Sequence, residues 1–212
     1  MTVAMRTSKG WFAGLVVAAA LGSGEAAQGQ EMRPRAAQPA PEIPLSERLA
    51  ELVPTCLACH GEDGVPNYAE SPIVDGQNEG YLFVQLRDYK NGARKHEAMN
   101  EIVKDLSRQD LRELAAYFAA RPWPRVDQPP PEDGSIDVER LLAEGQCREC
   151  HGADFLGDGT MPRLAGQLTS YLASTMRAFK LKERTNNAAM GSLLDTFSDE
   201  EIEAIARYLG AL

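Results

Sequence analysis

The sequence predicts an all-α protein built from two copies of one helical domain, and three observations lead to this fold class. Residues of the first half recur 91 positions later in the second half. No stretch alternates apolar and polar residues for long enough to indicate a sheet. Each half also has a helix-capping pattern, a hydroxyl followed three residues later by a carboxylate, at Ser107 and Asp110 and at Ser198 and Glu201.

The repeat extends along most of both halves. It begins at a Cys-x-x-Cys-His-Gly stretch, slips by one residue in the middle, and returns to its first register before the capped helices. The matched pairs include Cys56 and Cys147, Cys59 and Cys150, His60 and His151, Pro72 and Pro162, Gly76 and Gly166, Gln77 and Gln167, Tyr81 and Tyr171, and Met99 and Met190. Two copies of one domain explain this pattern.

The N-terminus has the layout of a secretory signal peptide. Arg6 and Lys9 precede an apolar run from 11 to 21, and small residues lead to Ala26. The run is far shorter than the roughly 20 residues that a membrane span needs. We therefore expect cleavage near Ala26, which makes residues 1–26 a signal peptide and the mature chain periplasmic. An uncleaved or lipid-tethered form is the alternative.

Composition sets the remaining boundaries. Residues 27–44 are rich in Pro, Ala and Gln without helical periodicity, which indicates a flexible leader. Residues 121–134 form a proline-rich linker, in which Trp123 is expected to act as a hydrophobic staple or to dock on a domain face. The first domain is therefore expected at residues 45–120 and the second at residues 135–212.

Each domain is expected to hold about three main helices. The last helix of each begins at its capping pattern, and the two earlier helices follow from apolar residues at helical spacing. The expected earlier helices are 47–55 and 81–89 in the first domain, and 138–146 and 171–179 in the second.

The chain is acidic, with a formal net charge of −9 that becomes −10 when the signal peptide removes two bases and one acid. Such a chain repels nucleic acid, so no nucleic-acid partner is expected. It favours a redox partner with a basic docking face. The alternative is that the charge serves only solubility.

All four cysteines fall in two Cys-x-x-Cys-His motifs, 56–60 and 147–151. Thiols at this spacing add to the two vinyl groups of one porphyrin, and the adjacent imidazole reaches the iron. A zinc site shared by both motifs is an alternative, whereas a thioredoxin-like pair lacks its βαβ context. We therefore predict two covalently bound haems c. The predicted attachment residues are Cys56, Cys59, Cys147 and Cys150, and the predicted proximal iron ligands are His60 and His151.

The sixth iron ligands follow by elimination. The chain has three histidines, so two haems with two histidines each are excluded. Met99 and Met190 each lie 39 residues after their proximal histidine, in an expected loop before the last helix, and are assigned as axial ligands. Met161 and Met176 remain alternatives, Met176 being expected in the core. His96 is an alternative at the first iron but is expected mainly as a solvated surface residue.

Some residues are expected to support these ligands. The carbonyls of Pro72 and Pro162 are candidates to accept a hydrogen bond from the proximal histidines, which would fix the orientation of the rings. Loop-shaping prolines are the alternative. Arginines that recur in both halves are candidates for pairing with haem propionates or with helix-surface carboxylates: Arg87, Arg177, Arg94 and Arg184.

Over residues 45–212 the sequence resembles the dihaem cytochromes c of the cytochrome c4 type. The resemblance rests on the paired motifs, the Gly76-Gln77 and Gly166-Gln167 steps, and the matched methionines and last helices. It implies two tandem class I cytochrome c folds about a pseudo-twofold axis, with His/Met ligation at both irons and haem edges close together. The triple-proline linker departs from the family pattern.

These features predict an electron carrier, not an enzyme, because an iron with two protein ligands has no open position for substrate. The resemblance implies periplasmic transfer of single electrons in a respiratory chain, and the expected partners are a terminal oxidase, a quinol-oxidising complex or a dehydrogenase. The alternative is a non-catalytic haem subunit of a periplasmic dehydrogenase, such as a flavocytochrome c sulfide dehydrogenase. A dihaem peroxidase is a third hypothesis. No transmembrane span is expected in the mature chain, and peripheral membrane association stays open.

Overall fold

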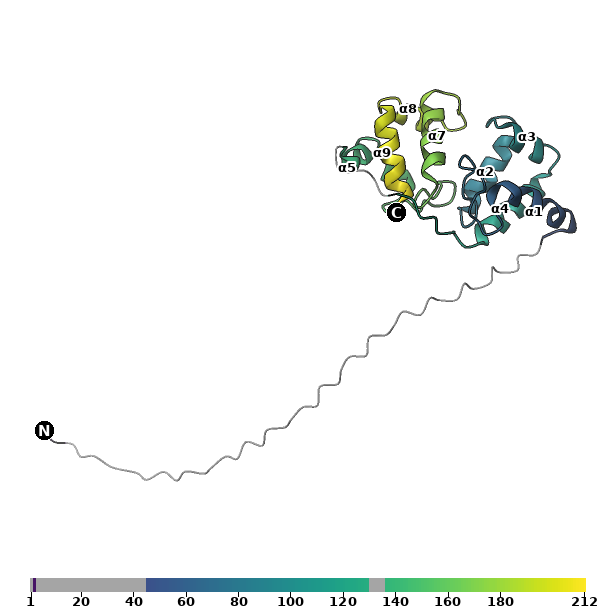
Figure 1. Cartoon of the computed structure of the whole chain (residues 1–212), viewed down its shortest axis with the longest axis horizontal. Helices are drawn as coiled ribbons and strands as arrows, with labels where there is room; N and C mark the ends of the chain where they lie inside the picture. The colour runs from purple at the N-terminus through teal and green to yellow at the C-terminus, as the bar shows by residue number, and fades with distance from the viewer. Residues whose placement is uncertain (1, 3–44, 130–135) are drawn as a thin grey trace. The chain divides into compact units, whose positions relative to one another are not determined.

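The computed structural model describes residues 45–129 and 136–212, together with Thr2. The expected signal peptide and leader, apart from Thr2, and part of the linker lie outside the described residues. The described ranges contain helices and no strand, so the all-α fold class is confirmed (Figure 1). The helices are α1 (Glu47–His60), α2 (Glu79–Lys90), α3 (Glu97–Val103), α4 (Arg108–Ala120), α5 (Val138–Glu144), α6 (Cys147–His151), α7 (Thr169–Lys180), α8 (Ala188–Leu194) and α9 (Asp199–Gly210).

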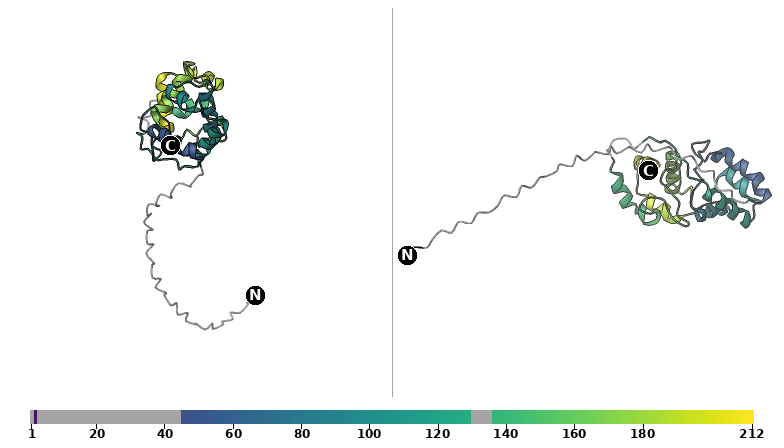
Figure 2. Two further views of the ribbon diagram at one scale, coloured as in Figure 1. Left: turned by 90° about the vertical axis from the view of Figure 1, so that its right-hand side faces the viewer. Right: turned by 90° about the horizontal axis from the view of Figure 1, so that it is seen from below.

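The helices gather around two separate apolar cores. In the first half α2 packs against α4, and in the second half α7 packs against α9. Figures 1 and 2 show these pairs in two groups of helices. The first core includes Leu49, Leu82, Val103, Leu111, Leu114 and Phe118, and the second includes Leu141, Leu172, Met176, Phe179, Ile202 and Ile205.

The last helix of each half begins as the capping pattern predicts. The Oγ atom of Ser107 accepts a hydrogen bond from the backbone N–H of Asp110 at 3.1 Å, and the Asp110 carboxylate accepts one from the Ser107 N–H at 2.7 Å. Ser198 and Glu201 make the same reciprocal pair, at 3.1 and 2.8 Å. Both capping boxes are confirmed, and they satisfy backbone donors that a helix start otherwise leaves free.

The helices around the two Cys-x-x-Cys-His motifs differ from the expectation and from each other. The first was expected to end at residue 55, but α1 continues through the motif to His60 although Pro54 lies inside it. The second was expected to run unbroken over 138–146. Instead α5 ends at Glu144 and a separate helix, α6, carries the motif, because Gln146 between them adopts a left-handed backbone conformation, with φ of 51°.

A second correction concerns Met99 and Met190, which were expected in loops. They lie in the short helices α3 and α8, whose starts are capped by the side chains of His96 and Asn187. Each capping side chain accepts a hydrogen bond from the backbone N–H of the methionine itself, at 3.4 Å and 3.2 Å. Seven residues are too few to show a helical period in the sequence, so these helices escaped prediction.

The described residues from Leu45 onward belong to one compact unit, and the linker residue Trp123 joins its two halves. An added Cβ would lie 2.8 Å from the Trp123 backbone nitrogen at Gly76, and 3.2 Å from the Trp123 Nε1 atom at Gly166. The guanidinium of Arg163 lies 4.3 Å above the Trp123 ring. Trp123 is therefore more than a staple for the linker, because it docks against the Gly-Gln steps of both halves.

Candidate haem-binding and ligand site

The two cysteines of each motif are placed by helical geometry. Cys56 and Cys59 lie three residues apart on α1, which puts both thiols on one side of the helix, and Cys147 and Cys150 repeat this on α6. All four cysteines are free of disulfide bonds. Burial raises the pKa of Cys56 to about 11 and also raises the pKa of Cys147, so both thiols are protonated at neutral pH.

The imidazole of each motif is held by a proline carbonyl of its own half. The Nδ1 atom of His60 lies 2.9 Å from the carbonyl oxygen of Pro72, and the Nδ1 atom of His151 lies 3.2 Å from that of Pro162. These two contacts confirm the expected support of the proximal histidines. Because a carbonyl only accepts, Nδ1 carries the proton and Nε2 keeps its lone pair for a metal.

Burial also favours the neutral form of both imidazoles. It lowers the pKa of His60 and of His151 below the ordinary value of 6.5, outweighing the hydrogen bonds that raise it. A neutral imidazole is the form that ligates iron. The motif residues are therefore in the chemical state that haem ligation requires.

A cavity of about 540 Å³ brings the expected site residues together. Its lining includes the motif cysteines, both motif histidines, and Met99 and Met190. Residues of both halves line it, so it is continuous between them. The cavity is mainly apolar, and each half contributes two thiols, an imidazole and a thioether to its lining. One such donor set suits one haem c, so the two sets together suit two haem groups.

The remaining methionines and the third histidine are placed differently. Met176 is 8 % exposed within the second core, as expected for a packing residue. Met161 also lines the cavity but directly precedes Pro162, so its segment is the one that supports His151. His96 is exposed and caps α3, as expected of a surface residue, and it also lines the rim of the cavity.

The geometry does not support a zinc site shared by the two motifs. Within the described parts of the chain, no group of three or more His, Cys, Asp or Glu side chains comes close enough together to hold a metal ion. A structural zinc ion needs four such ligands around one point. The two motifs therefore do not combine into one metal site.

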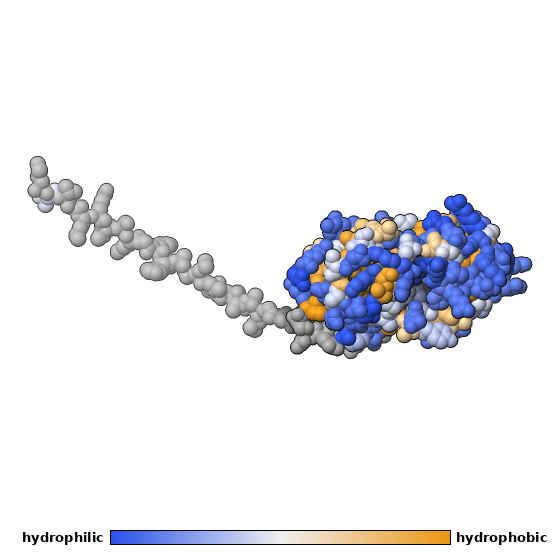
Figure 3. Space-filling view, turned by 90° about the horizontal axis from the view of Figure 1, so that it is seen from above, coloured by the Kyte–Doolittle hydropathy of each residue, from blue (hydrophilic) through white to orange (hydrophobic). Residues whose placement is uncertain are grey.

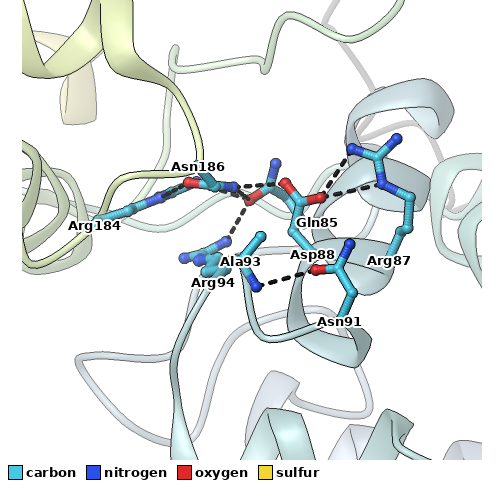
Figure 4. A network of polar contacts seen from close by, with 8 residues as sticks. All are labelled: Gln85, Arg87, Asp88, Asn91, Ala93, Arg94, Arg184 and Asn186. Carbon is cyan, nitrogen blue, oxygen red and sulfur yellow. Dashed lines mark hydrogen bonds and ion pairs between the residues drawn. The ribbon is translucent and has the colours of Figure 1, made fainter.

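Arg94 and Arg184 occupy the same position in the repeat and both line the cavity. Figure 4 shows the polar network that they share. Arg94 and Arg184 both donate to the Oε1 atom of Gln85, at 2.9 and 2.8 Å. Arg184 also donates to Asn186, whose amide donates to the carboxylate of Asp88 at 2.9 Å. Neither guanidinium forms an ion pair with a carboxylate of the described residues, and the nearby Asp88 pairs with Arg87 on α2.

The pKa of Tyr171 reflects the positive charge of these two arginines. Its hydroxyl accepts a hydrogen bond from Arg94 at 2.9 Å. Although burial raises the pKa of Tyr171, the charges of Arg94 and Arg184 outweigh it and lower the pKa to about 7. The site therefore favours a negative group beside the two arginines. The sequence showed that the arginines recur, but not that Gln85, Asn186 and Tyr171 join them.

Several known proteins are similar to this chain in sequence and in fold. A family model described as "Cytochrome C oxidase, cbb3-type, subunit III" matches residues 137–209. Cytochrome c4 of Pseudomonas aeruginosa is 34 % identical over 168 residues, which is 74 % of this chain and 83 % of that protein. The "Thiosulfate dehydrogenase electron acceptor" of Stutzerimonas stutzeri is 33 % identical over 72 % of this chain and 76 % of that protein. The crystal structure of reduced cytochrome c4 from Pseudomonas stutzeri superposes with a TM-score of 0.68 at 29 % identity, covering 79 % of this chain and all of that one.

The fold and the site together define a dihaem c-type cytochrome with two class I domains in tandem. Its cofactors are two covalently bound haems c, and it transfers electrons rather than catalysing a reaction. The chain belongs to the cytochrome c4 family.

Proposed function

We propose that this protein is a periplasmic carrier that passes single electrons between respiratory redox partners after removal of the signal peptide at residues 1–26. The observation that carries the proposal is the repeated donor set on one cavity: a free cysteine pair, an imidazole with its Nδ1 proton fixed, and a thioether from a separate helix. When bound, haem c supplies an iron that alternates between the ferric and ferrous states.

The proposal assigns a role to each residue of this donor set. Cys56 and Cys59 attach the first haem and Cys147 and Cys150 the second. His60 and Met99 hold the first iron, and His151 and Met190 the second. Residues 45–120 and 135–212 are the two domains, which the separate cores support.

The choice of Met99 and Met190 is supported by their surroundings. Each is half-buried, packs against the core of its own half and lies on a short helix that is separate from the proximal loop. An axial ligand must approach the iron from the face opposite the proximal histidine. Met161, on the proximal loop, is badly placed for this, and Met176 already fills the core.

Arg94 and Arg184 suit the acidic edge of the porphyrin. They are the paired guanidiniums of the cavity that lack a carboxylate partner in the described part of the chain. We assign them to the haem propionates, because guanidinium groups bind carboxylates through charge-assisted hydrogen bonds. Propionates held by these two arginines would lie near the contact between the two halves, where both guanidiniums bond Gln85.

The surface fits transient association with a partner. The chain carries a formal charge of −9, which favours a partner with a basic docking face. On the face drawn in Figure 3, apolar residues occur in several separate spots among hydrophilic ones. No helix among the described residues is long and apolar enough to cross a membrane. A terminal oxidase, a quinol-oxidising complex and a dehydrogenase are the candidate partners.

A second candidate function follows from one relative. The Stutzerimonas stutzeri protein is named as the electron acceptor of thiosulfate dehydrogenase. The same role here would make the chain a partner or haem subunit of a sulfur-oxidising dehydrogenase. This candidate predicts that a dehydrogenase accompanies the protein through mild purification, whereas a free carrier is isolated alone.

The test is isolation of the exported protein from its host under mild conditions. We expect two covalent haems per chain, both low-spin in the ferric state, and rapid reduction by a partner that slows as salt is added. A colourless exported protein, or a metal that chelators remove, would contradict the proposal. One high-spin haem in the purified protein would favour a peroxidase instead.

A further inference from the structure

Each matched glutamine of the two Gly-Gln steps forms hydrogen bonds with the backbone of the opposite half. These residues are Gln77 and Gln167. The Gln77 amide accepts a hydrogen bond from the Arg163 N–H at 2.8 Å and donates one to the Arg163 carbonyl at 3.0 Å. Gln167 makes the same pair of bonds with Ile73, at 2.8 and 3.0 Å. Both glutamines are almost fully buried, with exposed fractions of 3 % and 2 %.

The two residues bonded by these glutamines, Ile73 and Arg163, immediately follow the prolines that support the proximal histidines. Ile73 follows Pro72, so the Ile73 N–H and the Pro72 carbonyl belong to one planar peptide group. This single peptide accepts from His60 at its oxygen and donates to Gln167 at its nitrogen. In the second half, the peptide between Pro162 and Arg163 accepts from His151 and donates to Gln77.

Hydrogen bonds in such a chain polarise one another. A peptide whose N–H is already donating becomes a better acceptor at its carbonyl oxygen, and a buried setting strengthens the effect. A stronger acceptor at Nδ1 makes the histidine a more electron-rich ligand, which favours ferric over ferrous iron. Each glutamine therefore lies at the far end of a hydrogen-bond chain that leads to the imidazole of the other half.

We propose that Gln77 and Gln167 are positioning residues that act crosswise: Gln167 of the second half sets the strength of the His60 ligand, and Gln77 of the first half sets that of His151. The inference rests on the proposed haem ligation and goes beyond it. Contact between the halves then tunes both reduction potentials, since each proximal loop has its outer hydrogen bonds in the opposite domain.

The test uses the complete holoprotein with Gln167→Met, a side chain of similar length without hydrogen-bonding groups. The reduction potential of the first haem should rise and that of the second should stay unchanged. We expect about a threefold change in the equilibrium constant for electron sharing between the haems, smaller than the roughly 10- to 100-fold loss of metal affinity or activity that follows removal of a direct partner of a ligating histidine. Gln77→Met should shift the second haem instead. The Nδ1–H resonance of the affected histidine should move in the same crosswise pattern.

Gln128→Met is the matched control. Gln128 also bonds backbone groups, but these belong to the second half, at Gln167, Gly210 and Thr169. It should leave both potentials unchanged. If the glutamines only hold the halves together, each Met variant moves both haems, or the haem of its own half, and the proposal is refuted. An unchanged pair of potentials refutes it equally.

A second variant serves if the Met variants fold poorly. Gln167→Glu keeps an oxygen to accept from the Ile73 N–H but loses the N–H that donates to the Ile73 carbonyl. When ionised, the carboxylate accepts more strongly than the amide, so the first haem should shift to lower potential, opposite to Gln167→Met, and by more than the second haem. A shift in the same direction as Gln167→Met would overturn the inference. Haem content and spin state of the wild-type protein are measured first. Absent or high-spin haem there contradicts the proposed function itself, whereas intact haems with the wrong pattern of shifts contradict only the crosswise tuning.

Discussion

Replacing Met190 by alanine separates the role of a methionine in ligation from its role in packing. Met190 is half-buried at the edge of the second core, whereas Met176 is 8 % exposed within it. Truncation of a buried methionine costs about 2–5 kcal/mol of unfolding free energy. We therefore expect Met190→Ala to cost about 2 kcal/mol from packing and Met176→Ala more, towards 5 kcal/mol.

The spectroscopic effects should run in the opposite order. Met190 is the proposed axial ligand of one of the two haems. Its loss should therefore make that ferric haem high-spin and leave the other haem low-spin. Met176→Ala should leave both haems low-spin despite its larger cost in packing. Electron paramagnetic resonance measures the spin states, and urea unfolding followed by circular dichroism measures the stabilities.

The two variants together make the assignment refutable. If Met190→Ala keeps two low-spin haems, Met190 is not the ligand. If Met161→Ala or Met176→Ala produces the high-spin haem instead, the second iron is held from another part of the fold. Met99→Ala provides the matched experiment in the first half, where the high-spin signal should arise from the first haem alone.

Three further predictions concern the fold. Gly76→Ala should destabilise the fold by more than Gly92→Ala. Both glycines have positive φ, so alanine at either position carries a strain of about 1–3 kcal/mol. An added Cβ at residue 76 also meets the Trp123 backbone, whereas the space around residue 92 is open. Thermal unfolding measures both, and equal losses would contradict the packing of Trp123. Asp110→Ala, which removes the carboxylate at the third position of the helix, should cost about 0.3–1 kcal/mol at neutral pH. Hydrogen bonding to Ser107 lowers the pKa of Asp110 below 3.8 in the folded state, so this stabilisation is present above pH 3.8 and the difference from wild type should vanish as pH falls through the lowered value. A difference that persists in acid would argue against the capping role. Finally, protein prepared without haem should lose its cooperative thermal transition, and a sharp transition in calorimetry would show that the cores suffice alone.

The parts of the structure that the sequence predicted are those with local causes. The capping boxes at Ser107 and Ser198 depend on residues three positions apart. The bonds from His60 and His151 to proline carbonyls depend on one short loop in each half. Such contacts leave a signal in residue spacing, and the repeat showed each signal twice.

The parts that escaped prediction depend on contacts between distant segments. The residue types of Gln77 and Gln167 were visible as a match in the repeat, but their partners lie 86 and 94 residues away in the chain. The break at Gln146 arises from one residue with a left-handed backbone, which no residue preference of glutamine indicates. The clustering of Arg94 with Arg184 likewise depends on how the two halves meet.

The cavity shared by the two halves affects how the chain tolerates cleavage. Residues of both halves line it, so a haem bound in one half would lie close to side chains of the other. A protease cut in the proline-rich connection would release fragments whose exposed cofactor edges face water. Such fragments should bind each other again in a one-to-one pair. When kept apart, each fragment should expose more of its haem to water than the same half does in the intact protein.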